Sequence, residues 1–417
     1  MIRYAADELE TVRRHARRNR GLCYGSSLYQ QSFLDVLERN FFDGGSSGVG
    51  GLRPLVSFKP GGGGTFTRAS EASYYNAPPN TTGGFLSWAP VNTIREDQID
   101  GVAGGYLFEP AQTNLCYYSE DLSQASWIKG GGLTVSGTTA VAPDGAANCC
   151  TLAFTASATD SLSRPVAATT DATAYTSSVW VRKTAGTGSV RLRVIDRNSV
   201  TTTTANISIS TTWKRIEYVA VWGTGVATPE IHLLNDVAGT AQSVEVWGWD
   251  IKSSVIGGAA RNAPSSYVRT TSAAATRAAD DLSFATTPTA MLSGRYTFRF
   301  APNYATGESS ASSAYFTTGT TFNGIDSRTG ISTLSAQLAN VVKIAGPAIT
   351  FASRNLVMTA IIDLAAARIT ITGATTGSGT GALGVAVSHT QAILYIGKFN
   401  AASTFYAGGR IWEPYAA

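Results

Sequence analysis

The chain has 417 residues and a mass of 43.6 kDa, which predicts two or three domains rather than one. Charged residues make up only 14% and the net charge is +4 at pH 7, so the overall charge does not favour a nucleic-acid-binding protein. Glycine accounts for 43 residues and methionine for only 3. Together with the abundance of Thr, Ser and Ala, this composition is typical of all-β proteins with many turns.

The usual signals of membrane insertion and of secretion are missing from the sequence. No stretch approaches ~20 continuous apolar residues, so no transmembrane helix and no membrane insertion are expected. Residues 1–5 contain neither the apolar segment nor the cleavage site of a secretory leader. We therefore expect a chain that does not leave its cell by the usual secretory route.

Residues 1–52 differ from the rest of the chain and predict a short α-helical arm followed by a Gly/Ser linker. Between residues 5 and 20 the acidic side chains come early and the arginines late, which suits the dipole of a helix. A second pattern, between residues 27 and 42, places apolar side chains at helical spacing. Two short helices bury little surface alone, so we expect the arm to dock onto a partner or to oligomerise. The residues expected to make these contacts are Phe33, Leu34, Leu37, Phe41, Arg13, Arg14 and Arg17.

The arginines of the arm admit a second interpretation. Arg13, Arg14 and Arg17 belong to a basic run that would also suit nucleic acid. We favour a solvated face or contact with acidic protein partners, and we expect no nucleic-acid partner.

The remainder of the chain predicts two β-sandwiches separated by connectors. Residues 53–112 form short strand-like pieces broken by Pro and Gly, which predicts an irregular β-rich connector. Residues 113–256 contain several segments of period two, among them 189–196, and predict a first sandwich. A second connector over 257–284 precedes a second sandwich over 285–417. The expected fold class is thus mainly β, with two jelly-roll or concanavalin-like sandwiches behind the helical arm.

Tryptophans gather in the first sandwich and suggest a sugar-binding surface. Sugars stack on exposed aromatic rings, with polar groups fixing their hydroxyls. Trp247 and Trp249 are two residues apart in one strand, so we expect them to share a face. The candidates for a glycan-binding platform are therefore Trp247, Trp249, Trp222 and Trp180. The alternative is that each of these rings fills the core.

Catalytic chemistry finds little support in the sequence. The three histidines, His15, His232 and His389, lie in separate parts of the chain, so a His-based catalytic or metal site is not favoured. Glycoside hydrolysis needs two nearby carboxylates. Glu245 and Asp250 are five residues apart on one predicted strand, so we expect them to face opposite sides. We therefore expect no enzyme, no metal and no cofactor.

None of the four cysteines has the spacing of a zinc site. Free thiols are the favoured interpretation for Cys23, Cys116, Cys149 and Cys150. The alternative is a disulfide between subunits, with Cys23 of the arm as its first candidate. Adjacent Cys149 and Cys150 point to opposite faces of a strand, so a bond between them is not expected.

Three groups of residues carry a resemblance to a known family. They are FTRAS at 66–70, GYLFEPAQTNL at 105–115, and RNAPSSYV at 261–268 followed by TRAAD at 276–280. In this order, they resemble a module of bacteriophage head-spike and tail-fibre proteins. From the residues themselves we expect Arg68 and Arg277, in the two Thr-Arg-Ala motifs, to pair with a carboxylate such as Glu109 or Asp280. We interpret these groups as structural contacts rather than ligand contacts.

The resemblance carries expectations about each part of the chain. It implies that the first sandwich is similar to a carbohydrate-binding module. Residues 285–417 resemble a concanavalin-like lectin sandwich, whose late strands match ILYIG at 393–397 and FYAGGRI at 405–411.

The resemblance also carries expectations about function. The implied protein is a structural component of a virion, a fibre or spike of the tail, neck or head, assembled in the bacterial cytoplasm. It would be a homotrimer, docked to other virion proteins through its arm and binding a host surface polysaccharide. Two alternatives stay open: a purely architectural decoration protein that binds no sugar, and a glycan-degrading depolymerase.

Overall fold

The chain divides into two compact units, residues 1–54 and 55–417, and only parts of the second are described in the computed structural model. The described residues are 56–57, 64–79, 82–99, 102–137, 140–166, 173–256, 259–260, 262–285, 295–305, 308, 313–318, 323–328, 333–338, 341–348, 353–354, 357–363, 368–373, 377–380, 393–396 and 409–416. The predicted helical arm lies outside them, with Arg13, Arg14, Arg17, Phe33, Leu34, Leu37, Phe41 and the disulfide candidate Cys23.

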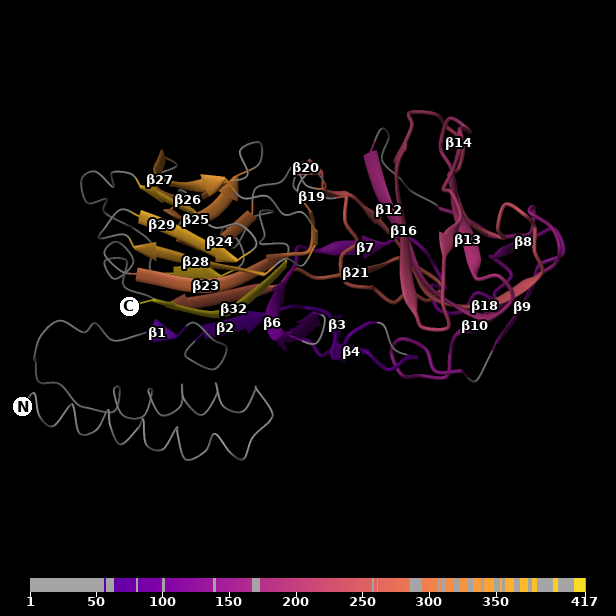
Figure 1. Ribbon diagram of the computed structural model, residues 1–417, viewed down its shortest axis with the longest axis horizontal. Helices are drawn as coiled ribbons and strands as arrows, with labels where there is room; N and C mark the ends of the chain where they lie inside the picture. The colour runs from indigo at the N-terminus through magenta and orange to yellow at the C-terminus, as the bar shows by residue number, and fades with distance from the viewer. Residues whose placement is uncertain are drawn as a thin grey trace, which may run out of the picture. The chain divides into compact units, whose positions relative to one another are not determined.

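All regular secondary structure of the described residues is β, which confirms the mainly β fold predicted for this part of the chain. The first sandwich consists of two sheets (Figure 1). The first sheet runs in the order β16 (Lys214–Trp222), β12 (Thr173–Ala185), β18 (Gln242–Ser253), β10 (Cys150–Phe154) and β9 (Thr134–Gly137). The second runs β14 (Thr201–Thr203), β13 (Ser189–Ile195), β17 (Glu230–Leu234), β11 (Ser161–Pro165) and β8 (Ile128–Gly130), with β15 (Ile207–Ser208) paired to β13.

The alternation seen in the sequence explains how these sheets form a core. In β13 the residues Val190, Leu192 and Val194 are buried, whereas Arg191 and Arg193 between them are half-buried on the other face. Period-two burial of this kind is what a sheet with one core face requires. The inner faces of both sheets enclose one cluster that includes Trp127 and Trp249, whose ring centroids lie 5.1 Å apart.

The C-terminal sandwich also contains two sheets, and both include strands from earlier in the chain. One runs β30 (Gly377–Thr380), β29 (Arg368–Gly373), β28 (Met358–Asp363), β23 (Arg295–Pro302), β32 (Gly409–Ala416), β6 (Val102–Phe108) and β5 (Glu96–Ile99), with β1 (Val56–Ser57) on β32. The other runs β2 (Gly64–Thr67), β22 (Asp281–Ala285), β31 (Ile393–Ile396), β24 (Ser313–Thr318), β25 (Asn323–Arg328), β26 (Thr333–Leu338) and β27 (Val341–Ala348).

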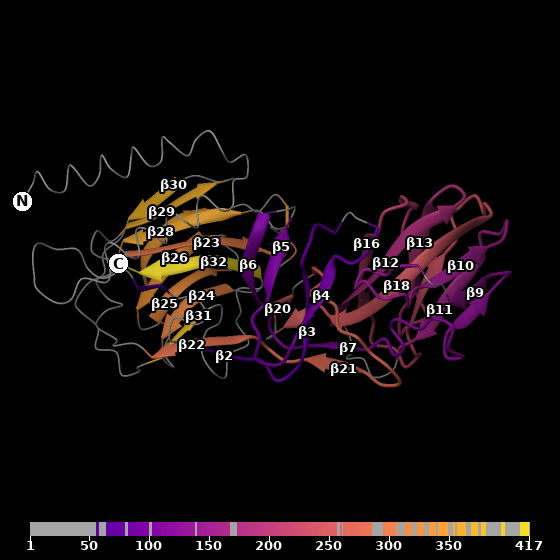
Figure 2. The same cartoon turned by 90° about the horizontal axis from the view of Figure 1, so that it is seen from below.

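The first sandwich is therefore an insertion into the C-terminal one, and we call it the inserted sandwich. Strands β2, β5 and β6 precede it and β22 follows it, although the sequence assigns these segments to connectors. The chain enters through β7 (Gln112–Asn114) and leaves through β21 (Ala275–Arg277), and these two strands pair with each other. Figures 1 and 2 show this ribbon, together with the pair β3 (Ala72–Tyr75) and β4 (Leu86–Ala89), between the two sandwiches. One further ribbon joins β19 (Val255–Ile256) to β20 (Ala259–Ala260).

A β-bulge in β18 changes which side chains face the core. Trp180 of β12 lies opposite Trp247, but Ser178, two residues earlier, lies opposite Asp250, three residues later. The extra residue falls at Gly248, whose φ of 67° lies in the left-handed region that glycine adopts without strain. After Gly248, every side chain of β18 points to the face opposite to the one predicted from a regular alternation with period two.

Two sequence predictions fail because of this bulge. Trp247 and Trp249 do not share a face: Trp249 belongs to the inner core, and Trp247 packs on the outer face of the sheet. Glu245 and Asp250 do not face opposite sides. They lie opposite Arg182 and Ser178, which are four residues apart on one face of β12.

The bulge gives a direct test of the fold. Replacing Gly248→Ala forces an alanine into the left-handed region and places its Cβ 3.4 Å from Cδ1 of Trp180. We expect the free energy of unfolding to fall by about 1–2 kcal/mol, measured by urea denaturation. Gly137→Ala is the matched control, since its Cβ would meet nothing within 4 Å. Equal stability of the two variants would contradict the assigned bulge.

Candidate functional site

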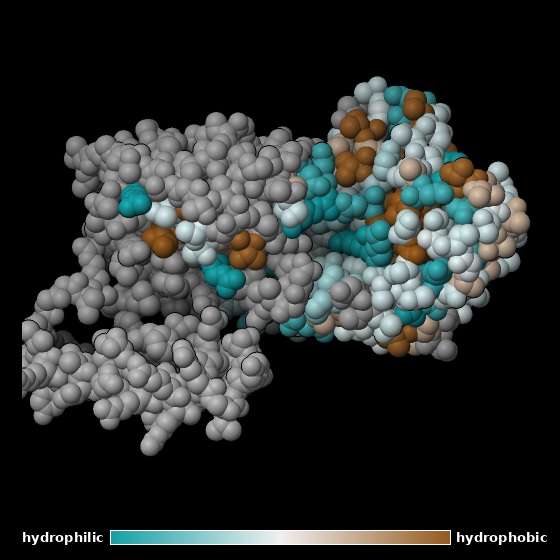
Figure 3. Space-filling model, in the orientation of Figure 1, coloured by the Kyte–Doolittle hydropathy of each residue, from teal (hydrophilic) through white to brown (hydrophobic). Residues whose placement is uncertain are grey.

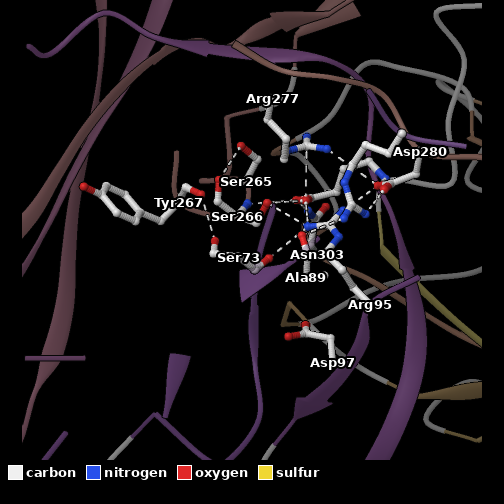
Figure 4. Close-up of polar contacts among 12 residues, drawn as sticks. Ser73, Ala89, Arg95, Asp97, Ser265, Ser266, Tyr267, Arg277, Asp280 and Asn303 are labelled. Carbon is white, nitrogen blue, oxygen red and sulfur yellow. Dashed lines mark hydrogen bonds and ion pairs between the residues drawn. The ribbon is translucent and has the colours of Figure 1, made fainter. Parts of the chain in front are cut away.

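Five charged side chains meet where the two sandwiches join, and we call them the ion cluster: Arg68, Arg95, Glu109, Arg277 and Asp280. None is more than 1% exposed. Arg68 Nη1 lies 3.1 Å from Asp280 Oδ1, and Arg95 Nη1 lies 2.9 Å from Glu109 Oε2. Arg95 also pairs with Asp280, and Arg277 lies 3.6 Å from both carboxylates (Figure 4). The predicted pairing of Arg68 and Arg277 with Glu109 or Asp280 is confirmed.

Each member of the ion cluster stands at the end of a different strand. Arg68 follows β2, Arg95 precedes β5, and Glu109 follows β6. Arg277 ends β21, and Asp280 precedes β22. Sequence analysis missed Arg95, because it belongs to no motif and its partners lie 14 and 185 residues away.

The third group of the sequence resemblance joins the ion cluster through Ser266. Its backbone N–H donates to Glu109 Oε1 at 2.9 Å, and its hydroxyl donates to Glu109 Oε2 at 2.6 Å. All three groups of the resemblance thus meet at one buried point, which supports interpreting them as structural contacts.

The electrostatic balance of the ion cluster keeps the carboxylate of Glu109 ionised. Burial alone would raise the pKa of Glu109, but Arg277, Arg95 and the two hydrogen bonds from Ser266 hold it well below its usual range. Burial opposes the charge of Arg95 as well, yet Asp280 and Glu109 raise its pKa above the ordinary value. Buried charges that are paired in this way are tolerated, whereas a single unpaired one is costly.

Next to the ion cluster lies a crevice of about 210 Å³. Its walls come from β3, from the outer face of β12 and β16, from the loop 264–267 and from the C-terminal sandwich. The lining side chains used below are Tyr75, Trp180, Arg215, Glu217, Asn303 and Arg354. Glu109 lines the crevice as well, so the ion cluster and the crevice share one residue.

Aromatic rings form one corner of the crevice. The ring of Tyr75 meets Trp180 edge-on, with centroids 6.1 Å apart, and stacks against Phe85 at 6.3 Å. Tyr75 is half-buried and is one of the residues that line the crevice. Burial raises the pKa of the Tyr75 hydroxyl, and the positive charge of Arg215 opposes that rise.

Ion pairs line the other walls. Arg215 Nη2 lies 3.2 Å from Asp250 Oδ2. Arg410 Nε donates to Asp97 at 2.6 Å. Arg354 Nη2 lies 2.6 Å from Glu308 Oε1, and its Nη1 pairs with Glu217 of the inserted sandwich.

A second, smaller cavity of about 20 Å³ lies beside Lys252 and Asp250, on the same sheet face. Lys252 Nζ lies 2.6 Å from Asp250 Oδ2, and burial lowers the pKa of Lys252 to about 8. Figure 3 shows hydrophilic side chains gathered in a hollow at the level of β7 and β21. The cavity beside Lys252 and Asp250, at about 20 Å³, has room for about one water and none for a sugar.

The predicted tryptophan platform is wrong as an exposed surface. Trp222 and Trp249 lie in the inner core, where they are at most 1% exposed. Trp180 and Trp247 point outward but are covered by a second apolar cluster that includes Phe85, and neither is more than 2% exposed. Only Trp180 lines the crevice. The core interpretation therefore holds for all four rings.

The thiols and the histidine of the described residues show no reactive arrangement. Cys116, Cys149 and Cys150 are free thiols, the interpretation favoured from the sequence, and all three are buried. Burial raises the pKa of Cys149 to about 12. Cys149 and Cys150 belong to different apolar clusters, which confirms that they face opposite sides. Burial lowers the pKa of His232 to about 4. Within the described ranges, no group of three or more His, Cys, Asp or Glu side chains is placed to hold a metal ion.

The described part of the chain also contains no helix long and apolar enough to cross a membrane.

Comparison with known proteins yields only distant structural similarity. No family model matches the chain, and no curated protein matches it. The CBM22-1 xylan-binding domain of Paenibacillus barcinonensis Xyn10C is 17% identical, with a TM-score of 0.28, over 34% of this chain and 92% of that one. The CBM22-1–CBM22-2 tandem of the same protein is 12% identical, with a TM-score of 0.29, over 73% and 99%. The enzymatically active domain of tailspike protein 4 of bacteriophage CBA120 is 12% identical, with a TM-score of 0.28, over 34% of this chain and 21% of that one. No residue role is transferred from similarities this weak.

The ion cluster predicts a specific dependence of stability on pH. Since the pKa of Glu109 lies below its ordinary value of 4.5 in the folded state, its stabilisation is present above about pH 4.5 and is lost as the pH falls. Glu109→Gln should lower the free energy of unfolding by about 3–5 kcal/mol at pH 7, because three buried guanidinium groups then share one carboxylate. The variant should also lose less stability than the wild type between about pH 5 and pH 3.

Urea denaturation across this pH range measures both effects. Asp121→Asn, at an exposed carboxylate, serves as the control and should cost far less at pH 7. If Glu109→Gln lowered the free energy of unfolding at pH 7 by no more than Asp121→Asn does, the assigned role of the ion cluster would be contradicted.

Proposed function

We propose that this chain is a non-catalytic structural protein of a bacteriophage virion, a fibre or spike whose crevice binds a glycan of the host surface. The observation that carries the glycan-binding part is the composition of the crevice, where an aromatic corner stands beside hydrogen-bonding side chains. Tyr75 offers a ring surface, and Asn303 and Glu217 offer polar atoms. A ring face for stacking and a few fixed polar groups for hydroxyls are what sugar recognition needs.

The virion part rests on the sequence resemblance. Its three groups meet in the ion cluster, which supports the view that the resemblance reflects a shared folding module. A module that needs all three groups at once is more specific than any short motif alone. The predicted site on the particle, the homotrimer and the docking arm belong to this proposal.

The proposed absence of catalysis rests on the pairing of the carboxylates in the crevice. A glycosidase needs one carboxyl group that donates a proton and a second that stays ionised near the scissile bond. Among the lining residues, Glu109, Glu217 and Asp97 each have an arginine partner. Burial raises the pKa of Asp97, but its oxygens accept hydrogen bonds from Arg410 and from the backbone of Tyr75. Because each is held in an ion pair, the lining residues offer no separate proton donor and free carboxylate for the two roles.

The crevice gives a prediction about glycan binding. Tyr75→Ala together with Asn303→Ala should weaken binding to host surface polysaccharide by at least about tenfold, or ~1.4 kcal/mol, because the ring surface and one polar group are lost. Isothermal titration calorimetry measures the affinity, and thermal unfolding checks that the variant folds. Val226→Ala, at a side chain that is 98% exposed and away from the crevice, is the control.

Three other results of this experiment decide between the alternatives. No binding by the wild type would favour the purely architectural protein. Release of new reducing ends from the polysaccharide would favour the depolymerase. Binding that the double variant leaves intact would place the sugar elsewhere on the molecule.

The arm gives a prediction about assembly. The full-length protein should have about three times the chain mass of 43.6 kDa in solution, and a variant without residues 1–52 should be a monomer. Light scattering with and without reductant measures this, and a reductant-sensitive oligomer would implicate Cys23. A monomer under every condition would contradict the proposed homotrimer.

A further inference from the structure

We infer that the crevice accepts one uncharged sugar unit and rejects acidic sugars such as uronic acids. This inference rests on the proposed glycan binding and adds to it the chemical class of the ligand. It follows from the charges of the lining residues, from their existing partners and from the size of the crevice.

The positive charges of the crevice are all committed to carboxylates. Three arginines line it, and each has an acidic partner: Arg215 pairs with Asp250, Arg354 with Glu217 and Glu308, and Arg410 with Asp97. The partners of Arg354 use its Nε and both of its terminal nitrogens. Because all three nitrogens of its guanidinium already contact carboxylates, Arg354 has no pair of free N–H donors with which to bind an incoming carboxylate.

The carboxylates of the crevice balance its arginines, so an acidic ligand finds no unpaired cation there. Of the lining carboxylates, Glu217 is 29% exposed, whereas Glu109 and Asp97 are buried beside their arginine partners. A uronate carboxylate entering here would lose its water without gaining a free cation, and an unpaired charge that is removed from water is strongly unfavourable. Sugar hydroxyls carry no such penalty, because they donate to the oxygens of Glu217 and Asn303, which are only half-buried.

The size of the crevice limits the ligand to a single ring. A volume of about 210 Å³ lies below the ~300–1,000 Å³ of pockets that enclose drug-sized ligands. The ion pair between Arg354 and Glu217, which both line the cavity, joins the C-terminal and the inserted sandwich. The geometry therefore suits a terminal sugar or a one-unit side branch rather than an internal run of a chain.

Matched pairs of small ligands test this inference. The methyl glycosides of glucose, galactose and mannose are compared with those of the corresponding uronic acids, by ligand-detected nuclear magnetic resonance on the full-length protein. At least one neutral glycoside should bind, and its acidic counterpart should bind at least about tenfold more weakly. Equal or tighter binding of the uronic acids would overturn the inference and leave the proposed function standing. If neither these ligands nor host polysaccharide bind, the proposed function fails together with the inference.

A change of selectivity provides the sharper experiment. Glu217→Gln combined with Glu308→Gln releases the guanidinium of Arg354, and both carboxylates are about one-third exposed, so the fold should tolerate the change. We expect the affinity for uronic acids to rise at least about tenfold relative to the affinity for the matched neutral sugars. Adding Arg354→Met should abolish the gain.

The matched control is Glu245→Gln. It removes the carboxylate of another arginine pair, with Arg182, on the same sheet face but outside the crevice. This variant should leave the selectivity unchanged. A double variant that gains no affinity for uronic acids, or a control that gains as much, would overturn the role assigned to the paired charges.

Discussion

The fold depends on five charges that have no access to water. Three guanidinium groups and two carboxylates of the ion cluster compensate one another only when the ends of β2, β5, β6, β21 and β22 are all in place. Because an uncompensated buried charge costs several kcal/mol, a partly assembled junction is disfavoured. This constraint explains how a chain that leaves one sandwich to form another returns to the same point, with β7 and β21 paired beside the cluster.

The crevice is a consequence of that junction. Its floor includes Glu109 of the ion cluster, and its walls come from both sandwiches, so neither sandwich contains the site alone. The inner faces of the inserted sandwich are filled by its own core, whereas one outer face is split into two parts. The part with Trp247 is covered by the segment around Phe85, and the part with Arg215 and Glu217 faces the cavity. A sheet face that is half covered and half open in this way leaves a ligand little choice of position.

Sequence analysis succeeded where the physics is local. The alternation in 189–196 predicts the strand Ser189–Ile195, and the opposite faces of Cys149 and Cys150 follow from the same period. The prediction failed at Gly248, because one inserted residue reverses the orientation of every later side chain of β18. The alternation of residue types along the strand does not reveal this insertion. The crevice was beyond its reach, since Tyr75 and Arg354 are brought together only by the return of the chain to the C-terminal sandwich.

The central claim is that the crevice between the sandwiches holds a sugar. A crystal structure of the protein soaked with a neutral oligosaccharide that binds in solution tests it most directly. We predict density for one sugar ring between Tyr75 and Asn303, with the ion pair of Arg354 and Glu217 intact beside it. Density on another surface, such as the outer face of β13 and β17, with the crevice holding only water, would contradict it.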